Sequence, residues 1–334
     1  MKLNILKIAG VAAVMTGLAA TPAMASCEPG ELVIKFSHVT ASSGHPKGEF
    51  AAALAARINE EMNGTACMEV FPNSTLFDDN KVMEALLLGD VQIAAPSLSK
   101  FESFTHKYRV FDLPFLFADM DAVNTFTQGE VGVELLNAIN DKGYVGLGYV
   151  YNGLKHFSAT RPLIAPSDAA GLKFRTQTSD VAVAMIEAMG ASAQKLAFSE
   201  VYGALQTGVV DGQENTWSNI YSKKFFEVQD GVTETNHQLL TYLAVTSKEW
   251  LDSLDADVRE QFLTIFNEEV IAANAKATEL NEIAKQNMIA AGGVVVELTP
   301  EQRQVWVDVM KPVWAKFADD IGQDVIDAAV AAGM

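Results

Sequence analysis

The segment that most constrains the fold lies near the C-terminus and contains no helix-breaking residue. Residues 255–291 include neither glycine nor proline and are rich in Ala, Glu, Leu, Asn and Lys, a composition that favours helix. At 1.5 Å per residue, one helix over this segment would be about 50 Å long, which exceeds the width of one small domain. Gly292 and Gly293 then end the pattern. We therefore expect a helix long enough to contact two domains.

Strand-like and helix-like patterns alternate through most of the chain before this helix. Apolar runs typical of strands lie at residues 32–36, 68–71, 91–95, 145–150, 172–175, 209–213 and 242–246. Alternation of this kind predicts α/β domains with largely parallel sheets. No linker rich in proline or serine separates the two halves, so we expect the chain to cross between the domains more than once.

These patterns predict a two-domain α/β clamp in which the long helix spans both domains. We assign residues 26–152 and 241–280 to the first domain, and residues 153–240 and 281–334 to the second. A clamp of this kind binds its ligand in the space between the two domains, so the site residues should come from both.

The N-terminus has the pattern of a secretory signal peptide. Lys2 and Lys7 are the only charged residues before an apolar run at residues 8–20, which is too short to span a bilayer. Residues 23–25 then read Ala-Met-Ala, a small-residue cleavage site. Together these features predict that residues 1–25 are removed by cleavage after Ala25 and that the mature chain is exported. The alternative, a buried N-terminal helix, is disfavoured by the same flanks.

The chain has two cysteines, Cys27 and Cys67. Residues 24–27 loosely resemble a lipoprotein cleavage box, which would attach lipid to Cys27. A disulfide is the preferred alternative, because each cysteine lies just before or at the start of an apolar strand pattern. If these two strands are parallel neighbours, their starting ends lie side by side, and export permits oxidation. We therefore predict a Cys27–Cys67 bridge.

The charge balance excludes one class of partner. The chain has 24 basic and 42 acidic residues and a net charge of −18. Binding of nucleic acid or anionic lipid requires basic patches, so neither is expected as a partner. The acidity favours solubility, and it requires any pocket for an anion to be locally basic.

Four polar residues occupy similar positions at or near the ends of predicted strands: Lys35, Ser97, Arg175 and Asn215. Ligands of open α/β sheets bind outside the carboxyl ends of the strands. Arg175 suits a carboxylate because its planar fork donates two charge-assisted hydrogen bonds. A helix that begins near Ser179 would also direct free N–H groups towards that site. Surface or turn positions remain the alternative for all four.

Enzyme motifs are weak in this sequence. It contains no H-E-x-x-H, G-x-S-x-G, G-x-x-x-x-G-K-[ST] or C-x-x-C motif. His38 and His45 are close together on a predicted loop, but two histidines make an incomplete metal site. The remaining histidines are isolated in the sequence and are expected to be structural, so no metal and no cofactor is predicted. Four aromatic residues near predicted strand ends are interpreted as core residues: Phe77, Phe198, Trp217 and Tyr221.

Residues 198–215, FSEVYGALQTGVVDGQEN, closely resemble the signature of DctP-type solute receptors of TRAP transporters, the tripartite ATP-independent periplasmic systems. Supporting similarities extend over nearly the whole mature chain, at residues 35–38, 71–74, 95–101, 111–117 and 171–175. The resemblance implies a clamp like the type II periplasmic binding proteins, which closes around an organic acid.

The resemblance also implies roles for individual residues. The family's carboxylate-binding arginine falls on Arg175, and its motif asparagine falls on Asn215. Lys155 stands where some members, notably sialic acid receptors, have a second arginine. Lys35, Ser97 and residues 217–221, which begin with Trp217, are most similar to the C4-dicarboxylate subgroup. We expect Arg175, Asn215 and Lys155 to bind one carboxylate, and Lys35 and Ser97, from the other domain, to bind the second. Trp217, which the resemblance places beside them, is the sixth expected ligand-binding residue.

The resemblance therefore implies a monomeric receptor in the periplasm that performs no chemistry on its ligand. Its partners would be a small carboxylate, succinate, malate or fumarate among them, and the integral membrane subunits of a TRAP transporter. Other ligands remain open: a monocarboxylate, a sugar acid or an amino-acid derivative. Two other roles also remain open, a periplasmic hydrolase that uses the His38 and His45 region and a protein that presents its ligand to a sensor kinase.

Overall fold

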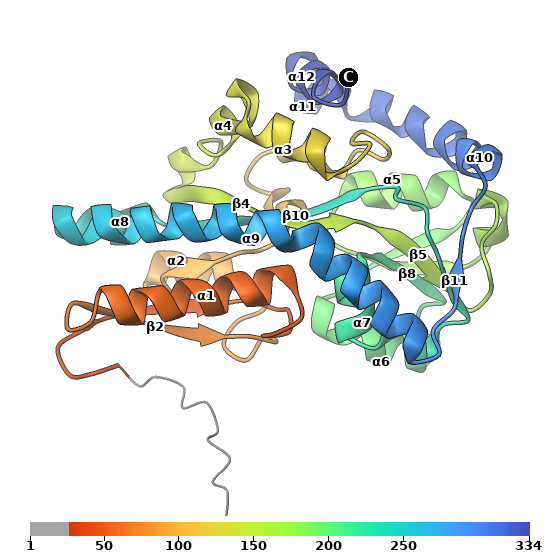
Figure 1. Cartoon of the computed structure of the whole chain (residues 1–334). Coiled ribbons are helices and arrows are strands. Elements are labelled where there is room, and N and C mark those ends of the chain that lie inside the picture. The colour runs from red at the N-terminus through yellow and green to blue at the C-terminus, as the bar shows by residue number, and fades with distance from the viewer. Residues whose placement is uncertain (1–26) are drawn as a thin grey trace, which may run out of the picture.

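The computed structural model describes residues 27–334. Two sheets, each with its own helices, form two α/β domains that lie side by side, and the long helix runs along both (Figure 1). The predicted two-domain clamp is confirmed. The predicted signal peptide and its cleavage site after Ala25 lie outside the described residues. No helix in the described part of the chain is long and apolar enough to cross a membrane.

The first domain is built on a five-stranded sheet. Its strands are β1 (Leu32–Ser37), β2 (Ala66–Phe71), β3 (Ile93–Ala94), β4 (Tyr144–Leu154) and β10 (Leu239–Ser247), in the order β2-β1-β3-β10-β4. β1 is parallel to β2 and β3, whereas β10 is antiparallel to β3 and β4. Its helices before the crossover are α1 (Pro46–Glu61), α2 (Val82–Leu88), α3 (Met120–Gln128) and α4 (Glu130–Leu135).

The second domain is built on a six-stranded sheet in the order β11-β9-β5-β8-β6-β7. Its strands are β5 (His156–Ala159), β6 (Lys173–Thr176), β7 (Ser192–Lys195), β8 (Gly212–Asn215), β9 (Gly231–Thr233) and β11 (Val295–Val296). β6 is parallel to β7 and β8, and β5 is antiparallel to β8 and β9. Its helices are α5 (Asp180–Ala188), α6 (Val201–Gln206), α7 (Trp217–Ser222) and α10 (Pro300–Met310).

Both sheets are mixed, which differs from the prediction of largely parallel sheets. The physical reason lies in the crossings between domains. The chain leaves the first sheet along β4, enters the second along β5, and returns from β9 to β10. β5 and β10 therefore join their sheets without the covering helix that a parallel strand needs, and both lie antiparallel to their neighbours.

The predicted long helix is α9 (Ala256–Ala290), which has 35 residues and follows the short helix α8 (Lys248–Ser253). Its first half packs on α1 and β4, and its second half contacts α7 (Figure 1). Phe262 and Phe266 are buried in the core of the first domain, whereas Ala284 and Met288 are buried in the core of the second. α9 therefore connects the two cores directly.

The C-terminal segment does not stay in the second domain as assigned from the sequence. α10 packs there, where Trp306 lies against Phe157. α11 (Ala318–Ile321) and α12 (Gln323–Ala331) return to the first domain, where α12 packs on α3. Their apolar residues Ile321 and Val325 belong to the same buried cluster as Phe111. The assignment of residues 281–334 to one domain therefore fails for α11 and α12.

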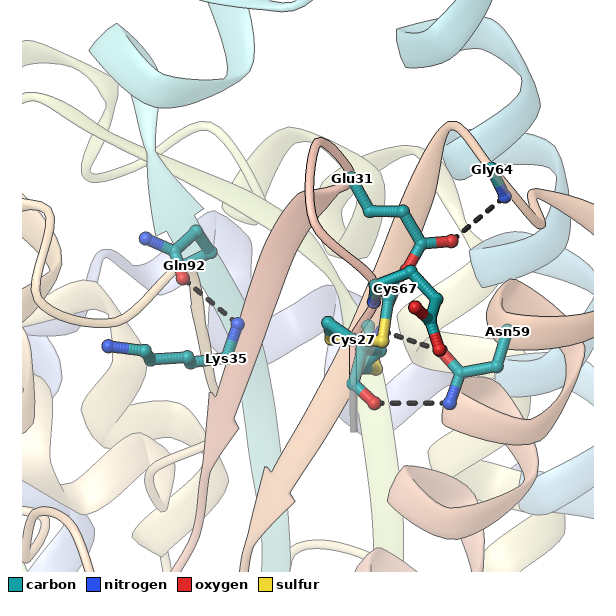
Figure 2. Close-up of a disulfide and its surroundings, with 9 residues drawn as sticks. Cys27, Glu31, Lys35, Asn59, Gly64, Cys67 and Gln92 are labelled. Carbon is teal, nitrogen blue, oxygen red and sulfur yellow. Dashed lines mark hydrogen bonds between the residues drawn. A yellow bond between two sulfur atoms is a disulfide. The ribbon is translucent and has the colours of Figure 1, made fainter. Parts of the chain in front are cut away.

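The predicted disulfide joins Cys27 to Cys67, with a Cα–Cα distance of 5.4 Å (Figure 2). β1 and β2 are parallel, and Cys67 pairs in register with Val33, so the bridge lies at the starting ends of these two strands. Glu31 lies beside it and accepts a hydrogen bond from the Gly64 N–H at 2.8 Å. Because the sulfur of Cys27 is bonded to Cys67, it is not free to carry a lipid.

Candidate ligand-binding site

A partly open cavity lies between the two domains and is lined by residues of both. Its centre has about 20 Å³ of free space, room for about one water molecule, so the domains meet closely around it. The first domain contributes Val39, Thr40, Asp78, Asp79, Asn80, Lys100, Leu240 and Tyr242, and the second contributes Arg175, Gln177, Ala197, Phe198, Asn215 and Asn219. Several of these residues follow or end strands, as expected for a site at the carboxyl ends of a sheet.

Arg175 is buried on β6 at one wall of the cavity. Its Nε and Nη2 atoms both donate to the carbonyl oxygen of Leu196, at 3.1 and 2.9 Å. Its guanidinium carbon lies 5.9 Å from the centre of the Phe198 ring. Burial lowers the pKa of Arg175 to about 10, while the nearby carboxylates of Glu214 and Asp79 oppose this shift. Arg175 therefore remains a cation at neutral pH, held in a fixed orientation.

Lys100 brings a second cation to the cavity from the opposite domain. It follows β3 in a 3₁₀ turn, Leu98–Phe101. Its Nζ donates to Asn80 Oδ1 at 2.8 Å and to Thr178 Oγ1, in the second domain, at 3.1 Å. Burial lowers the pKa of Lys100, Asp79 raises it, and the charge of Arg175 lowers it. Lys100 and Arg175 are therefore close enough for each to act on the charge of the other.

Asp79 is one of two acidic residues, with Asp78, that line the cavity beside the cations Lys100 and Arg175. Burial raises the pKa of its carboxyl group, and the cations Lys47, Lys100 and Arg175 oppose that shift. Asp79 therefore supplies a local negative charge among three positive ones. For a dianionic ligand to bind, its attraction to the cations must exceed its repulsion by the Asp79 carboxylate.

A directional chain of hydrogen bonds begins in the first domain and passes Asn215 at the cavity wall. The Nδ1 atom of His45 accepts from the Lys47 N–H at 3.1 Å, so Nε2 carries the proton and donates to Asn219 Oδ1 at 2.9 Å. Asn219 donates to Asn215 Oδ1 at 2.6 Å, and Asn215 donates to Gln213 Oε1 at 2.7 Å. Each amide is thus fixed in orientation before a ligand arrives.

Of the six predicted ligand-binding residues, Arg175 and Asn215 line the cavity and Lys35 and Ser97 do not. The side chain of Lys35 is half-buried on the flank of β1 near Gln92, whose Oε1 accepts the Lys35 N–H (Figure 2). It lies two residues before the strand ends. Ser97 is buried beneath the following turn, where its hydroxyl group donates to Ser99 Oγ at 3.3 Å. Neither residue is placed to contact a ligand in this cavity.

Lys155 and Trp217 also lie outside the cavity lining. Lys155 is buried and forms an ion pair with Glu214 at 2.8 Å, so its charge is compensated within the second domain. Its Nζ also donates to Gln238 Oε1 at 2.8 Å. Trp217 packs on His156, with 4.2 Å between the ring centres, and faces a separate hollow beside α9. Both residues therefore act in the structure around the crossing segments.

We expected the N-terminus of α5 to face the cavity, but the structure places it elsewhere. Ser179 caps it and accepts from the Ala182 N–H at 3.1 Å, as predicted. The N–H of Asp180 donates to Glu102, a first-domain residue, at 3.3 Å. The Asp180 carboxylate in turn accepts from Arg109 at 3.2 Å. This end of α5 therefore contributes to contact between the domains and not to an anion site.

His38 and His45 are both buried, and neither lines the cavity. His45 caps α1, and burial with the adjacent Lys47 charge lowers its pKa to about 3. Within residues 27–334, the only group with metal-ligand geometry is Cys27, Glu31 and Cys67. In that group the two sulfurs are bonded to each other.

Comparison with known proteins identifies the family. Residues 36–320 match the family described as bacterial extracellular solute-binding protein, family 7, DctP. The chain belongs to this family. It is 61% identical over 322 residues to the C4-dicarboxylate-binding periplasmic protein DctP of Vibrio cholerae, an alignment that covers 96% of this chain and 97% of that protein.

Solved structures of TRAP periplasmic solute-binding proteins have the same fold as this DctP-family chain. One from Shewanella oneidensis, with bound succinate, is 52% identical with a TM-score of 0.89, and the match covers 91% of this chain and all of that one. One from Pseudomonas aeruginosa, with bound L-malate, is 41% identical with a TM-score of 0.84, covering 85% and 99% of the two chains. The protein is thus a TRAP-type extracytoplasmic solute-binding protein.

Proposed function

We propose that this DctP-family protein binds a C4-dicarboxylate in the periplasm and delivers it to the membrane subunits of a TRAP transporter. The observation that supports this most directly is the pair of cations, Arg175 and Lys100, which reach one cavity from opposite domains. Two separated cations suit a short ligand with a carboxylate at each end. The ligands of the similar solved structures, succinate and L-malate, have this form.

In this proposal Arg175 binds one carboxylate through the edge of its guanidinium group that Leu196 leaves free. Asn215 and Asn219 lie beside it. Lys100, with Thr40 nearby, takes the role first expected of Lys35 and Ser97 and binds the second carboxylate. A ligand held in this way contacts both domains, so its binding free energy favours the closed form over the open one.

The export steps belong to the same proposal. Cleavage after Ala25 would release a mature chain whose Cys27 lies close to its new N-terminus and forms the disulfide with Cys67. The membrane subunits would recognise the closed form of this monomeric receptor. Edman sequencing of protein purified from the periplasm tests the cleavage site, and a first residue other than Ser26 contradicts it.

Ligand-dependent thermal stability tests the proposed ligand class. Protein purified from the periplasm is mixed with succinate, fumarate or L-malate, and in parallel with monocarboxylates and sugar acids. A ligand at 100 times its dissociation constant stabilises the folded state by about 2.7 kcal/mol, which melting curves resolve. We expect shifts with the C4-dicarboxylates. Shifts confined to monocarboxylates or sugar acids would keep the solute receptor but contradict its ligand, and turnover detected by NMR would instead favour the hydrolase.

The two lysines give a matched pair of variants. We expect Lys100→Met to weaken succinate binding by tenfold or more, because it removes a partly buried cation that faces the cavity. Lys35→Met should leave the affinity within twofold, because this side chain does not line the cavity. Isothermal titration calorimetry measures both. A larger loss in Lys35→Met than in Lys100→Met would reverse the assignment.

A further inference from the structure

Lys47 is a completely buried cation in the first turn of α1. Its Nζ donates to the carbonyl oxygen of Ala95 at 2.8 Å and lies 3.7 Å from the centre of the Tyr242 ring. Within residues 27–334, no carboxylate forms an ion pair with it. Removing a charge from water without an opposite charge is costly, and such groups are normally paired. A buried lysine that lacks this partner requires an explanation.

The charged and titratable groups around Lys47 leave its charge only partly compensated. Asp79 attracts it, and Lys223 repels it. His38 and His45 are neutral neighbours whose pKa values are lowered by burial and by Lys47. Tyr242 is neutral as well, because burial raises the pKa of its hydroxyl group. Burial lowers the pKa of Lys47 itself to about 8, so it carries its charge at neutral pH with little margin.

Lys47 is close to the ligand cavity although it does not line it. Tyr242, whose ring it contacts, is a cavity residue, and so is Asp79, the carboxylate that interacts with it. The charge therefore acts from behind the first-domain wall, the same side from which Lys100 reaches the ligand. At several ångströms through a protein interior, one unit charge changes an interaction free energy enough to alter affinity about tenfold.

We propose that Lys47 is a specificity-determining residue that makes this cavity select dianions over monoanions, its missing counter-charge being supplied by the second carboxylate of the ligand. The proposal rests on the proposed function and adds a residue to it. Arg175 can hold a single carboxylate, so it does not discriminate between the two classes of ligand. Lys47 does not line the cavity, so in this proposal it affects the ligand through charge and not through a hydrogen bond.

Succinate and succinamate test the proposal, because succinamate has nearly the same shape but one carboxylate replaced by an amide. We expect Lys47→Met, measured by calorimetry at pH 7, to weaken succinate binding about tenfold or more and to leave succinamate binding within twofold. The ligand-free variant should melt at the same or a higher temperature, because an unpaired buried charge is removed. Lys276→Met, an exposed lysine on α9, is the control and should change neither affinity.

The pH dependence gives a second readout, and the Lys47→Met variant isolates the contribution of Lys47 to it. With a pKa of about 8, Lys47 loses most of its proton between about pH 7 and pH 9 in the ligand-free protein, and a bound dianion favours its return. At pH 9, succinate binding should therefore take up close to one proton more per molecule bound than succinamate binding. Calorimetry in buffers of different ionisation enthalpy measures this proton uptake. Lys100 and Lys223 titrate in the same protein, but Lys47→Met retains both, so only the Lys47 contribution should disappear.

Several outcomes would overturn the proposal: an equal loss for both ligands in Lys47→Met, an unchanged succinate affinity, or equal proton uptake for the two ligands in the unsubstituted protein. Failure of the proposed function looks different. In that case the unsubstituted protein binds no C4-dicarboxylate at all, whatever residue occupies position 47.

Discussion

Replacing Arg175 by methionine is expected to weaken succinate binding by roughly 30-fold or more, because truncating one partner of a buried, hydrogen-bonded charge pair costs about 2–5 kcal/mol. Arg175 is 2% exposed, so water cannot replace the lost donors. Arg175→Lys keeps the charge but loses the planar fork and its contact with Leu196. Its succinate affinity should therefore lie between that of the unsubstituted protein and that of Arg175→Met. Titration calorimetry measures all three.

Stability provides the control for this prediction. Arg175 is buried, and burial lowers its pKa to about 10, so we expect the folded protein to hold this charge at a desolvation cost. The ligand-free Arg175→Met variant should therefore melt no lower than the unsubstituted protein. If its succinate affinity is unchanged, Arg175 is not part of the binding site. If it unfolds, Arg175→Lys still distinguishes a binding role from a structural one.

Removal of the disulfide should have the largest effect on stability. The bridge joins residues 40 positions apart, and restricting a loop of that length in the unfolded chain is worth about 4 kcal/mol in the chain-entropy model. The Cys27→Ser, Cys67→Ser double variant should lose most of this amount in urea unfolding. Succinate affinity should stay the same, because the bridge lies at the starting ends of β1 and β2, whereas the cavity lies beyond their carboxyl ends.

Two measurements would contradict the disulfide prediction. One is a loss of less than about 1 kcal/mol in the free energy of unfolding, which would mean that the bridge constrains little of the unfolded chain. The other is the detection of two free thiols when the denatured, unreduced protein is titrated. A weakened succinate affinity in a folded double variant would separately show that the two ends of the sheet are coupled.

The features that could be predicted from the sequence are those set by local chemistry. α9 follows from a run without glycine or proline, and the cap at Ser179 follows from the hydroxyl group that precedes a helical pattern. The disulfide followed from two strands whose starting ends were expected to be neighbours. In each case the residues that determine the feature are close in sequence or belong to adjacent elements of a regular α/β pattern.

The features that could not be predicted depend on contacts between distant segments. The apolar residues of α11 and α12 do not by themselves indicate which domain they pack on, and the path of the chain after α10 brings α12 to α3. In the site, Ser97 follows β3 as expected, but the 3₁₀ turn that begins after it buries it and brings Lys100, three residues later, to the cavity. Lys47 lies on the buried face of a helix, where the sequence pattern alone gives no reason to expect a charge.

The position of the cavity between the domains has a consequence for the speed of uptake. Because its walls come from both domains, separating the domains widens the path by which a ligand enters or leaves, so domain opening influences both the association and the dissociation rates. The apparent dissociation constant equals the intrinsic one divided by the fraction of molecules in the open, receptive form. The contact of Arg109 with Asp180 joins the domains without lining the cavity. We expect residues of this kind to affect how quickly the receptor loads and unloads without changing its contacts with the ligand.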